Sequence, residues 1–469
     1  MKEASDPALL SLVELAGKLR SKAISPVEIT RHMLDRIERL EPNLHAYALV
    51  TAEAALEEAH VAESEIMAGR YRGLLHGVPI AVKDLCLTKG VTTACGTTIL
   101  KSWQPEIDAT VVERLRVSGA VSLGKLQMTE GAFADHHPAI QPPLNPWHPA
   151  HWSGASSSGS GVATAASLCF GSLGSDTGGS IRFPSTANGV TGLKPTWGRV
   201  SRYGVFPLAD SLDHIGPMTR TAADAAAMLA AIAGEDANDP TSLVAPVPDY
   251  LAGLAQGVLG ARGLRIGIDT SFNSEGVEAR VVEVVEAAAR VFDRLGATLV
   301  DVAMPDTGKV VENWAPFCAV ETAIAHKATY PSRADEYGGT LAGLIDLGHG
   351  LTARQLGEIM IERDRFKGRL VRLFGQVDLM LIPAMYLAGP TFERMSRLSD
   401  PAELAMLLKF TSPFDVSGSP TITLQGGFSD EGLPVGFQLV GPHLSEDVLL
   451  RAGHAYQQET DWHTRHPSL

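Results

Sequence analysis

In the stretch Gly171-Ser-Leu-Gly-Ser-Asp-Thr-Gly-Gly-Ser-Ile-Arg-Phe-Pro184, Ser180 directly follows a threonine and two glycines. A turn without side chains at Gly178 and Gly179 can bring several backbone N–H groups close to one point. Acyl transfer needs such donors beside a nucleophile, because an oxyanion forms when the hydroxyl attacks a carbonyl. The stretch therefore favours a serine nucleophile, although a simple tight turn has the same pattern.

The composition is that of a large globular enzyme. The chain has 469 residues, of which 45% are apolar and 20% charged. Its net charge of −14 argues against a nucleic-acid partner. The start MKEASDPALL has no apolar signal core, and the longest apolar stretches are too short to span a bilayer, so we expect no membrane partner. Four separated cysteines without a CxxC pair indicate reduced thiols and a cytoplasmic location.

Hydrophobic periodicity predicts helices and strands along most of the first half. Residues 8–69 are predicted to be helical, with the pair Ser25-Pro26 at a helix start. Residues 75–83 predict a short apolar strand, and residues 109–124 a helix followed by a strand. Residues 125–220 are rich in Gly, Ser, Pro and Thr and keep few helical periods. We expect that segment to be irregular, buried and functional.

The second half predicts an α/β arrangement. A strand over 263–269, a helix over 276–295 and a strand over 297–302 form a βαβ unit, which requires parallel strands and a right-handed crossover. Further helices and strands are predicted over residues 221–234, 311–372, 377–382, 420–424 and 433–439. These elements predict the α/β class, with one large sheet and helices on both of its faces.

Two further motifs carry the chemistry that a serine nucleophile needs. The first is GVPIAVKD over residues 77–84, which places Lys83 at the end of an apolar strand. The second is the serine-rich turn WSGASSSGS over residues 152–160. A lysine buried at a strand end must lower its pKa or find a partner, and a neutral lysine is a competent general base.

Together the three motifs resemble those of the amidase signature family, which hydrolyses amides with a Ser–Ser–Lys triad whose middle serine has a cis peptide bond. The resemblance covers most of the chain and implies a large mixed sheet. It implies that Lys83 is the base, Ser156 the middle serine and Ser180 the nucleophile. Ser156 and Ser180 are 24 residues apart, which is the usual spacing in that family. The segments 192–200 and 213–220 also look like segments of the family.

The resemblance further implies a mechanism and a set of supporting residues. Lys83 would take a proton from Ser156, which takes one from the nucleophile, and no metal or other cofactor is needed. The oxyanion would be held by the backbone N–H groups of Thr177, Gly178, Gly179 and Ser180. Ser157 and Asp176 would hold the two turns by hydrogen bonds, and Arg182 would anchor a carboxylate in the scaffold. The family's acyl pocket falls on Gly131, Ala132 and Phe133, for which simple packing is the alternative role.

The chain departs from the family pattern at several positions. Ala155 and Ser158 stand where glycines are usual, and Ser158 is therefore a second candidate for the middle serine. Leu126 and Gln127 replace a Thr-Asn pair. Four histidines could suggest a metal site, namely His136, His137, His148 and His151. They have no HExxH motif and no acidic partner at ligand spacing, which argues against a metal. The GxSxG nucleophile elbow is absent, which argues against an α/β-hydrolase.

The resemblance implies one amidase domain over residues 1–469. It would comprise a helical N-terminal segment (1–70), a catalytic core (71–235) and a C-terminal α/β part with substrate-capping helices (236–469). The expected activity is hydrolysis of small carboxamides and anilides, with aryl carbamates (urethanes) or esters as further candidates, through an acyl-enzyme on Ser180. A homodimer remains open.

The alternative function is the glutaminase-type subunit of a tRNA-dependent amidotransferase. Residues 411–420 look more like those of stand-alone amidases, and we find no equivalent of the charged glutamine clamp of that amidotransferase. Apolar residues are frequent between Trp314 and Leu347 and near Met385. If these segments cap the site, the pocket favours aryl or acyl groups over charged ones.

Overall fold

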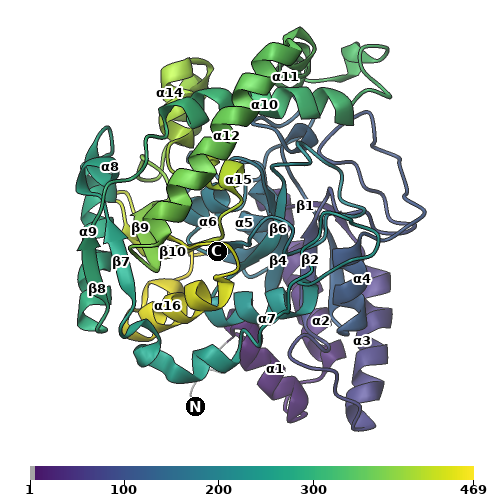
Figure 1. The fold of residues 1–469 in the computed structure, drawn as a ribbon. Helices are drawn as coiled ribbons and strands as arrows, with labels where there is room; N and C mark the ends of the chain where they lie inside the picture. The colour runs from purple at the N-terminus through teal and green to yellow at the C-terminus, as the bar shows by residue number, and fades with distance from the viewer. Residues whose placement is uncertain (1–5) are drawn as a thin grey trace.

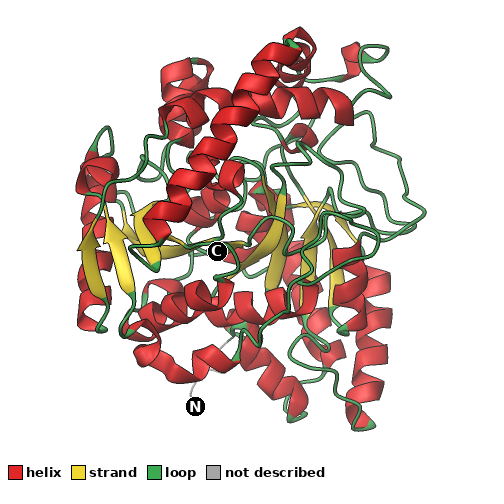
Figure 2. Ribbon diagram, in the orientation of Figure 1, coloured by secondary structure: helices red, strands yellow, loops and turns green. Residues whose placement is uncertain are grey.

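A mixed sheet of eleven strands runs through the centre of the molecule in the computed structural model, which describes residues 6–469 (Figures 1 and 2). The sheet contains four parallel strand pairs, and its other pairs are antiparallel. This confirms the predicted α/β class. In spatial order the strands are β1 (Tyr47–Val50), β3 (Val121–Leu126), β2 (Pro79–Lys83), β4 (Gly171–Asp176), β6 (His214–Thr219), β5 (Thr191–Lys194), β10 (Thr421–Phe428), β11 (Pro434–Val440), β9 (Leu379–Pro383), β7 (Arg265–Ile268) and β8 (Thr298–Asp301).

Helices lie on both sides of this sheet (Figure 2). In the view of Figure 1, α7 and α16 lie below the sheet, whereas α10, α11 and α12 lie above it. The α-helices are α1 (Leu12–Arg20), α2 (Pro26–Leu44), α3 (Ala52–Met67), α4 (Thr110–Val117), α5 (Ser158–Ala165), α6 (Arg182–Asn188), α7 (Ala222–Ile232), α8 (Thr270–Ser274), α9 (Ala279–Arg294), α10 (Gly308–Ala325), α11 (Gly339–Gly350), α12 (Ala353–Phe374), α13 (Phe392–Met395), α14 (Pro401–Leu408), α15 (Ser412–Ser417) and α16 (Glu446–Glu459).

The N-terminal part confirms one local prediction and corrects another. Ser25 caps α2, because its hydroxyl accepts a hydrogen bond from the Glu28 backbone N–H at 3.0 Å and the Glu28 side chain returns to the Ser25 backbone. The prediction of helix throughout residues 8–69 is wrong at β1. This strand has four residues and pairs antiparallel with β3, so it depends on a distant partner and leaves no period of its own in the sequence.

The predicted βαβ unit is confirmed. Strands β7 and β8 pair in parallel, with Arg265 opposite Thr298 and Ile268 opposite Asp301, and α9 connects them. The apolar side of α9 is buried, including Val281, Val284 and Val291. Its helical period therefore decides how it packs against the sheet.

The prediction of an irregular, buried segment over residues 125–220 is confirmed only in part. Residues 133–150 contain no helix or strand and residues 151–202 are almost all buried, but the segment also contains α5, β4, α6, β5 and β6. Every residue of these three strands is buried, so no alternation of polar and apolar positions marks them. The small residues allow close approach of neighbouring elements. A Cβ at Gly174, for example, would lie 2.8 Å from the sulfur of Met218 on the adjacent strand.

Two compositional expectations concern the whole chain. Within residues 6–469 no helix combines the length and the apolar character that a bilayer crossing requires. Residues 1–5, the beginning of the N-terminal stretch without an apolar core, lie outside the described part. All four cysteines are buried as free thiols.

Candidate active site

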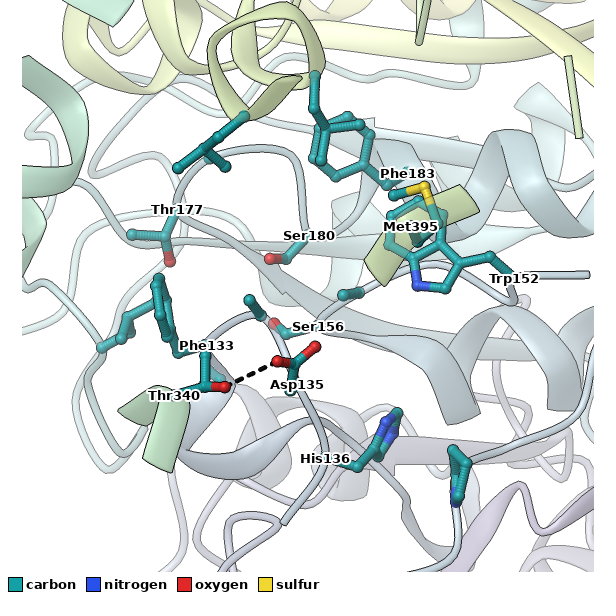
Figure 3. A pocket seen from close by; sticks show the side chains of 18 of the residues that line it. Phe133, Asp135, His136, Trp152, Ser156, Thr177, Ser180, Phe183, Thr340 and Met395 are labelled. Carbon is teal, nitrogen blue, oxygen red and sulfur yellow. Dashed lines mark hydrogen bonds between the residues drawn. The ribbon is translucent and has the colours of Figure 1, made fainter. Parts of the chain in front are cut away.

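A cavity of about 680 Å³ opens beside the turn that carries Ser180 (Figure 3). Its walls come from distant parts of the chain: the serine-rich turn before α5, the turn after β4, the loop after β3, and helices α10, α13 and α14. The hydroxyl-bearing side chains of Ser156 and Ser180 both line it. The sheet therefore brings the two predicted serines to one cavity.

Lys83 ends β2 and is completely buried beneath this cavity. Its Nζ donates hydrogen bonds to the hydroxyls of Ser156 at 2.7 Å, Ser157 at 2.9 Å and Ser175 at 2.8 Å. Burial lowers the pKa of Lys83 to about 7, although the negative charges of Asp213 and Asp176 oppose that shift. A large fraction of this lysine is therefore neutral near neutral pH, as a general base requires.

The geometry of the serine-rich turn distinguishes Ser156 from Ser158, the two candidates for the middle serine. Ser156 follows a cis peptide bond from Ala155, and its carbonyl accepts a hydrogen bond from the Thr129 N–H at 3.2 Å. Ser158 instead begins α5, and its hydroxyl lies 3.0 Å from Nε2 of His136. Among the predicted serines, Ser156 combines contact with Lys83 and a place in the cavity wall.

Ser180 stands at the accessible end of its turn. The nine preceding residues, 171–179, are all buried, whereas Ser180 is partly exposed to the cavity. Its carbonyl accepts a hydrogen bond from the Ser157 N–H at 3.3 Å, which ties the two serine turns together. The turn therefore presents one hydroxyl to an incoming molecule.

The backbone N–H groups of this turn divide into two sets. Gly179 donates its N–H to the Asp176 carboxylate at 2.7 Å and does not line the cavity. Thr177, Gly178 and Ser180 do line the cavity, and their N–H groups have no acceptor among the described residues. This geometry argues against the predicted role of Gly179 as an oxyanion donor and leaves the other three groups available.

Glycine is required at both positions of the pair for steric reasons. A Cβ on Gly178 would lie 2.7 Å from an indole carbon of Trp314. Gly179 has φ of +133°, and a Cβ there would lie 2.6 Å from the Phe183 ring. The same Trp314 donates its indole N–H to the Thr177 carbonyl at 2.8 Å. Because a trans peptide holds its C=O and N–H in opposite directions, this bond orients the Gly178 N–H.

A buried ion cluster supports the turn from behind. Arg182 lies at the start of α6 and donates to Asp176 at 2.8 Å and to Asp415 at 2.6 Å, and all three side chains are fully buried. Burial alone would raise the pKa of Asp176, but the Arg182 guanidinium outweighs burial and holds that pKa below its usual range. The carboxylate that positions Gly179 therefore stays ionised, and Arg182 contacts scaffold carboxylates and does not line the cavity.

The rest of the cavity wall agrees only in part with the sequence prediction. Ala132 and Phe133 line the cavity, whereas Gly131 does not and donates its N–H to the Cys95 carbonyl at 3.0 Å. Trp314 is in the wall as expected, but Met385 is not. A further apolar wall, which was not predicted, comes from α13 and α14. The period of α14 marks an apolar helix face but not its place at the cavity. The wall comprises Phe392, Met395, Leu404, Leu407 and Leu408.

Comparison with known proteins identifies the class to which this fold and site belong. The model of the family Amidase matches residues 28–450, and the chain belongs to that family. The protein named "Putative amidase AmiD" of Mycobacterium tuberculosis is 50% identical over 465 residues, which is 98% of this chain and 96% of that protein. The solved native peptide amidase of Stenotrophomonas maltophilia matches with a TM-score of 0.82 and 30% identity, over 97% of this chain and 98% of that one.

The family also includes a different class of relative. A glutamyl-tRNA(Gln) amidotransferase subunit of Methylococcus capsulatus is 39% identical over 487 residues, which covers 98% of both proteins. These findings confirm the resemblance to the amidase signature family. The protein is an amidase-family hydrolase that acts on amide C–N bonds.

Proposed function

We propose that the protein is a stand-alone amidase that forms an acyl-enzyme on Ser180. One observation carries the proposal: the buried Lys83 Nζ lies 2.7 Å from the Ser156 hydroxyl, in the wall of the cavity to which Ser180 is exposed. Neutral Lys83 accepts a proton from Ser156, and Ser156 accepts one from Ser180. The Ser180 Oγ then bonds to the substrate carbonyl carbon.

The turn supplies electrostatic stabilisation for the oxyanion that this attack creates. The N–H groups of Thr177, Gly178 and Ser180 line the cavity without other acceptors among the described residues. One well-placed donor of this kind contributes about 3–4 kcal/mol to transition-state stability. The C–N bond breaks as the relay returns a proton to the leaving nitrogen. Water then hydrolyses the acyl-enzyme by the same relay and frees Ser180.

The cavity favours substrates with apolar groups. Trp152, Phe183 and the apolar residues of α13 and α14 form much of its wall. Such a wall suits aryl and alkyl groups, so anilides, carboxamides and aryl carbamates are the proposed substrates. Glutamine carries a carboxylate that calls for a cationic partner, and no Lys or Arg is present among the described residues of the wall. This composition favours the stand-alone amidase over the glutaminase-type subunit.

A labelling and turnover experiment tests this proposal. We expect a fluorophosphonate to form one adduct, which mass spectrometry maps to Ser180. We also expect the purified protein to hydrolyse p-nitroacetanilide, benzamide or an aryl carbamate without a partner. The stand-alone function would be contradicted if glutamine were the only substrate that the protein hydrolyses and if ammonia were released only after amidotransferase partner subunits are added.

The lowered pKa of Lys83 predicts a pH dependence of catalysis. The base form of Lys83 is the neutral one, and its pKa is about 7, so the competent fraction increases as pH rises through this value. We expect kcat/KM for an anilide to fall about tenfold per pH unit below about pH 7 and to level off above about pH 8. Circular dichroism over the same range separates this effect from unfolding. A flat profile across a folded range would show that Lys83 is not the titrating base.

A further inference from the structure

The cavity holds one carboxylate that the proposed mechanism does not use. Asp135 follows the short 3-10 helix Glu130–Ala132 and lines the cavity together with Ser156 and Ser180. Its Oδ2 accepts a hydrogen bond from the Thr340 hydroxyl of α11 at 2.8 Å. In the view of Figure 3 the carboxylate lies between Thr340 and Ser156. The hydrogen bond from α11 orients this carboxylate in the wall that also contains Ser156 and Ser180.

This carboxylate has no cation to neutralise it within the described residues. Its side chain is exposed to solvent, and among the described residues Thr340 is its only hydrogen-bond partner. Of the two histidines in the wall, His136 has a pKa that burial lowers to about 4, so it is neutral near pH 7. His137 is the other titratable neighbour in the wall. The Asp135 charge is therefore free to attract a positive group from outside.

Asp135 is exposed to solvent, so a ligand that enters the cavity can reach its carboxylate. The opposite side of the cavity is apolar, with Trp152, Phe183 and Met395 labelled in Figure 3. A ligand that spans the cavity would therefore meet an apolar surface at one end and a negative charge at the other. An ion pair at such an exposed carboxylate is partly screened by water, so its contribution to selectivity is modest.

From this arrangement we propose that Asp135 selects amide substrates whose acyl part carries a protonated amine. The ammonium would lie against the Asp135 carboxylate while an apolar group contacts the opposite wall and the scissile carbonyl reaches Ser180. This inference rests on the proposed amidase function and adds a substrate class to it: aminoacyl amides with apolar groups.

Two pairs of p-nitroanilides test the inference. Within each pair the substrates differ only in the amine: leucyl against 4-methylpentanoyl p-nitroanilide, and 6-aminohexanoyl against hexanoyl p-nitroanilide. The variant is Asp135→Asn, whose amide oxygen can still accept the Thr340 hydrogen bond while the charge is lost. In at least one pair, we expect the ratio of kcat/KM for the aminated over the plain substrate to fall at least about threefold in the variant, the size that an exposed ion pair supports. Dividing the aminated-to-plain ratio of the variant by that of the wild type cancels the intrinsic effect of the amine on carbonyl reactivity.

A matched charge change controls for the altered net charge. Asp293→Asn removes an exposed carboxylate on α9 that does not line the cavity, and should leave both ratios unchanged. If wild-type protein hydrolyses the plain anilides and Asp135→Asn leaves both ratios unchanged, the inference is overturned while the amidase function stands. If wild-type protein cleaves none of the four substrates and no fluorophosphonate labels Ser180, the proposed function itself fails.

Discussion

Replacement of Ser180 by alanine is expected to lower kcat/KM for an anilide by at least about 10⁴-fold. The substitution removes the nucleophile, so no acyl-enzyme can form, while the N–H groups that line the cavity stay in place. Stopped assays of p-nitroaniline release with purified protein measure the loss. Fluorophosphonate labelling should disappear in parallel, because the same hydroxyl forms both adducts.

Ser158→Ala is the matched control for that experiment. Ser158 belongs to the neighbouring serine-rich turn and is the second candidate for the middle serine, yet its hydroxyl contacts His136 and makes no hydrogen bond with Lys83. We expect this variant to keep kcat/KM within about tenfold of the wild type. Near-normal turnover in Ser180→Ala would refute the nucleophile assignment, and a loss of equal size in Ser158→Ala would place Ser158 in the relay.

Replacement of Lys83 by methionine is expected to lower kcat by at least about 10³-fold. Methionine fills similar space but cannot accept a proton, and general-base catalysis contributes about 10²–10⁴-fold. The hydroxyls of Ser156, Ser157 and Ser175 also lose their shared partner. The residual activity should no longer show the break near pH 7 that the wild type shows, since the titrating group is gone.

Lys125→Met separates this catalytic effect from the cost of altering a buried lysine. Lys125 is as buried as Lys83, but its Nζ donates to the Cys86 carbonyl and to Thr93 and makes no hydrogen bond to the serines. We expect Lys125→Met to lower thermal stability while the folded protein keeps kcat within about tenfold. A folded Lys83→Met enzyme with kcat within tenfold of the wild type would rule out Lys83 as the base.

The sequence predicted those parts of the fold that depend on neighbouring residues. The capped start of α2 and the unit of β7, α9 and β8 follow from local spacing and helical period, and the structure contains both. The strands between residues 125 and 220 could not be found in this way. They are buried throughout, and glycine, serine or threonine interrupts their apolar residues, so neither alternation nor a continuous apolar run distinguishes them.

The site residues also differ in how far local sequence could predict them. The motif spacing singled out Lys83 and Ser156, which the structure brings into contact. It could not foresee that Asp176 binds the Gly179 N–H, because a motif does not specify the direction of a peptide plane. The wall formed by α13 and α14 was missed for a different reason. Those helices lie more than two hundred residues beyond Ser180 in sequence, and only the fold brings them to the cavity.

The bond from Trp314 to the Thr177 carbonyl has a consequence for dissecting this protein. It spans 137 positions, and the bonds from Thr411 to the Gly178 carbonyl and from Arg182 to Asp415 each span 233. The peptide planes of the nucleophile turn are therefore fixed by residues far outside the three motifs. A fragment that keeps all three motifs but ends before α10 would retain the reacting groups without their alignment. Hydrolytic activity is accordingly a sensitive reporter that the last third of the polypeptide has docked.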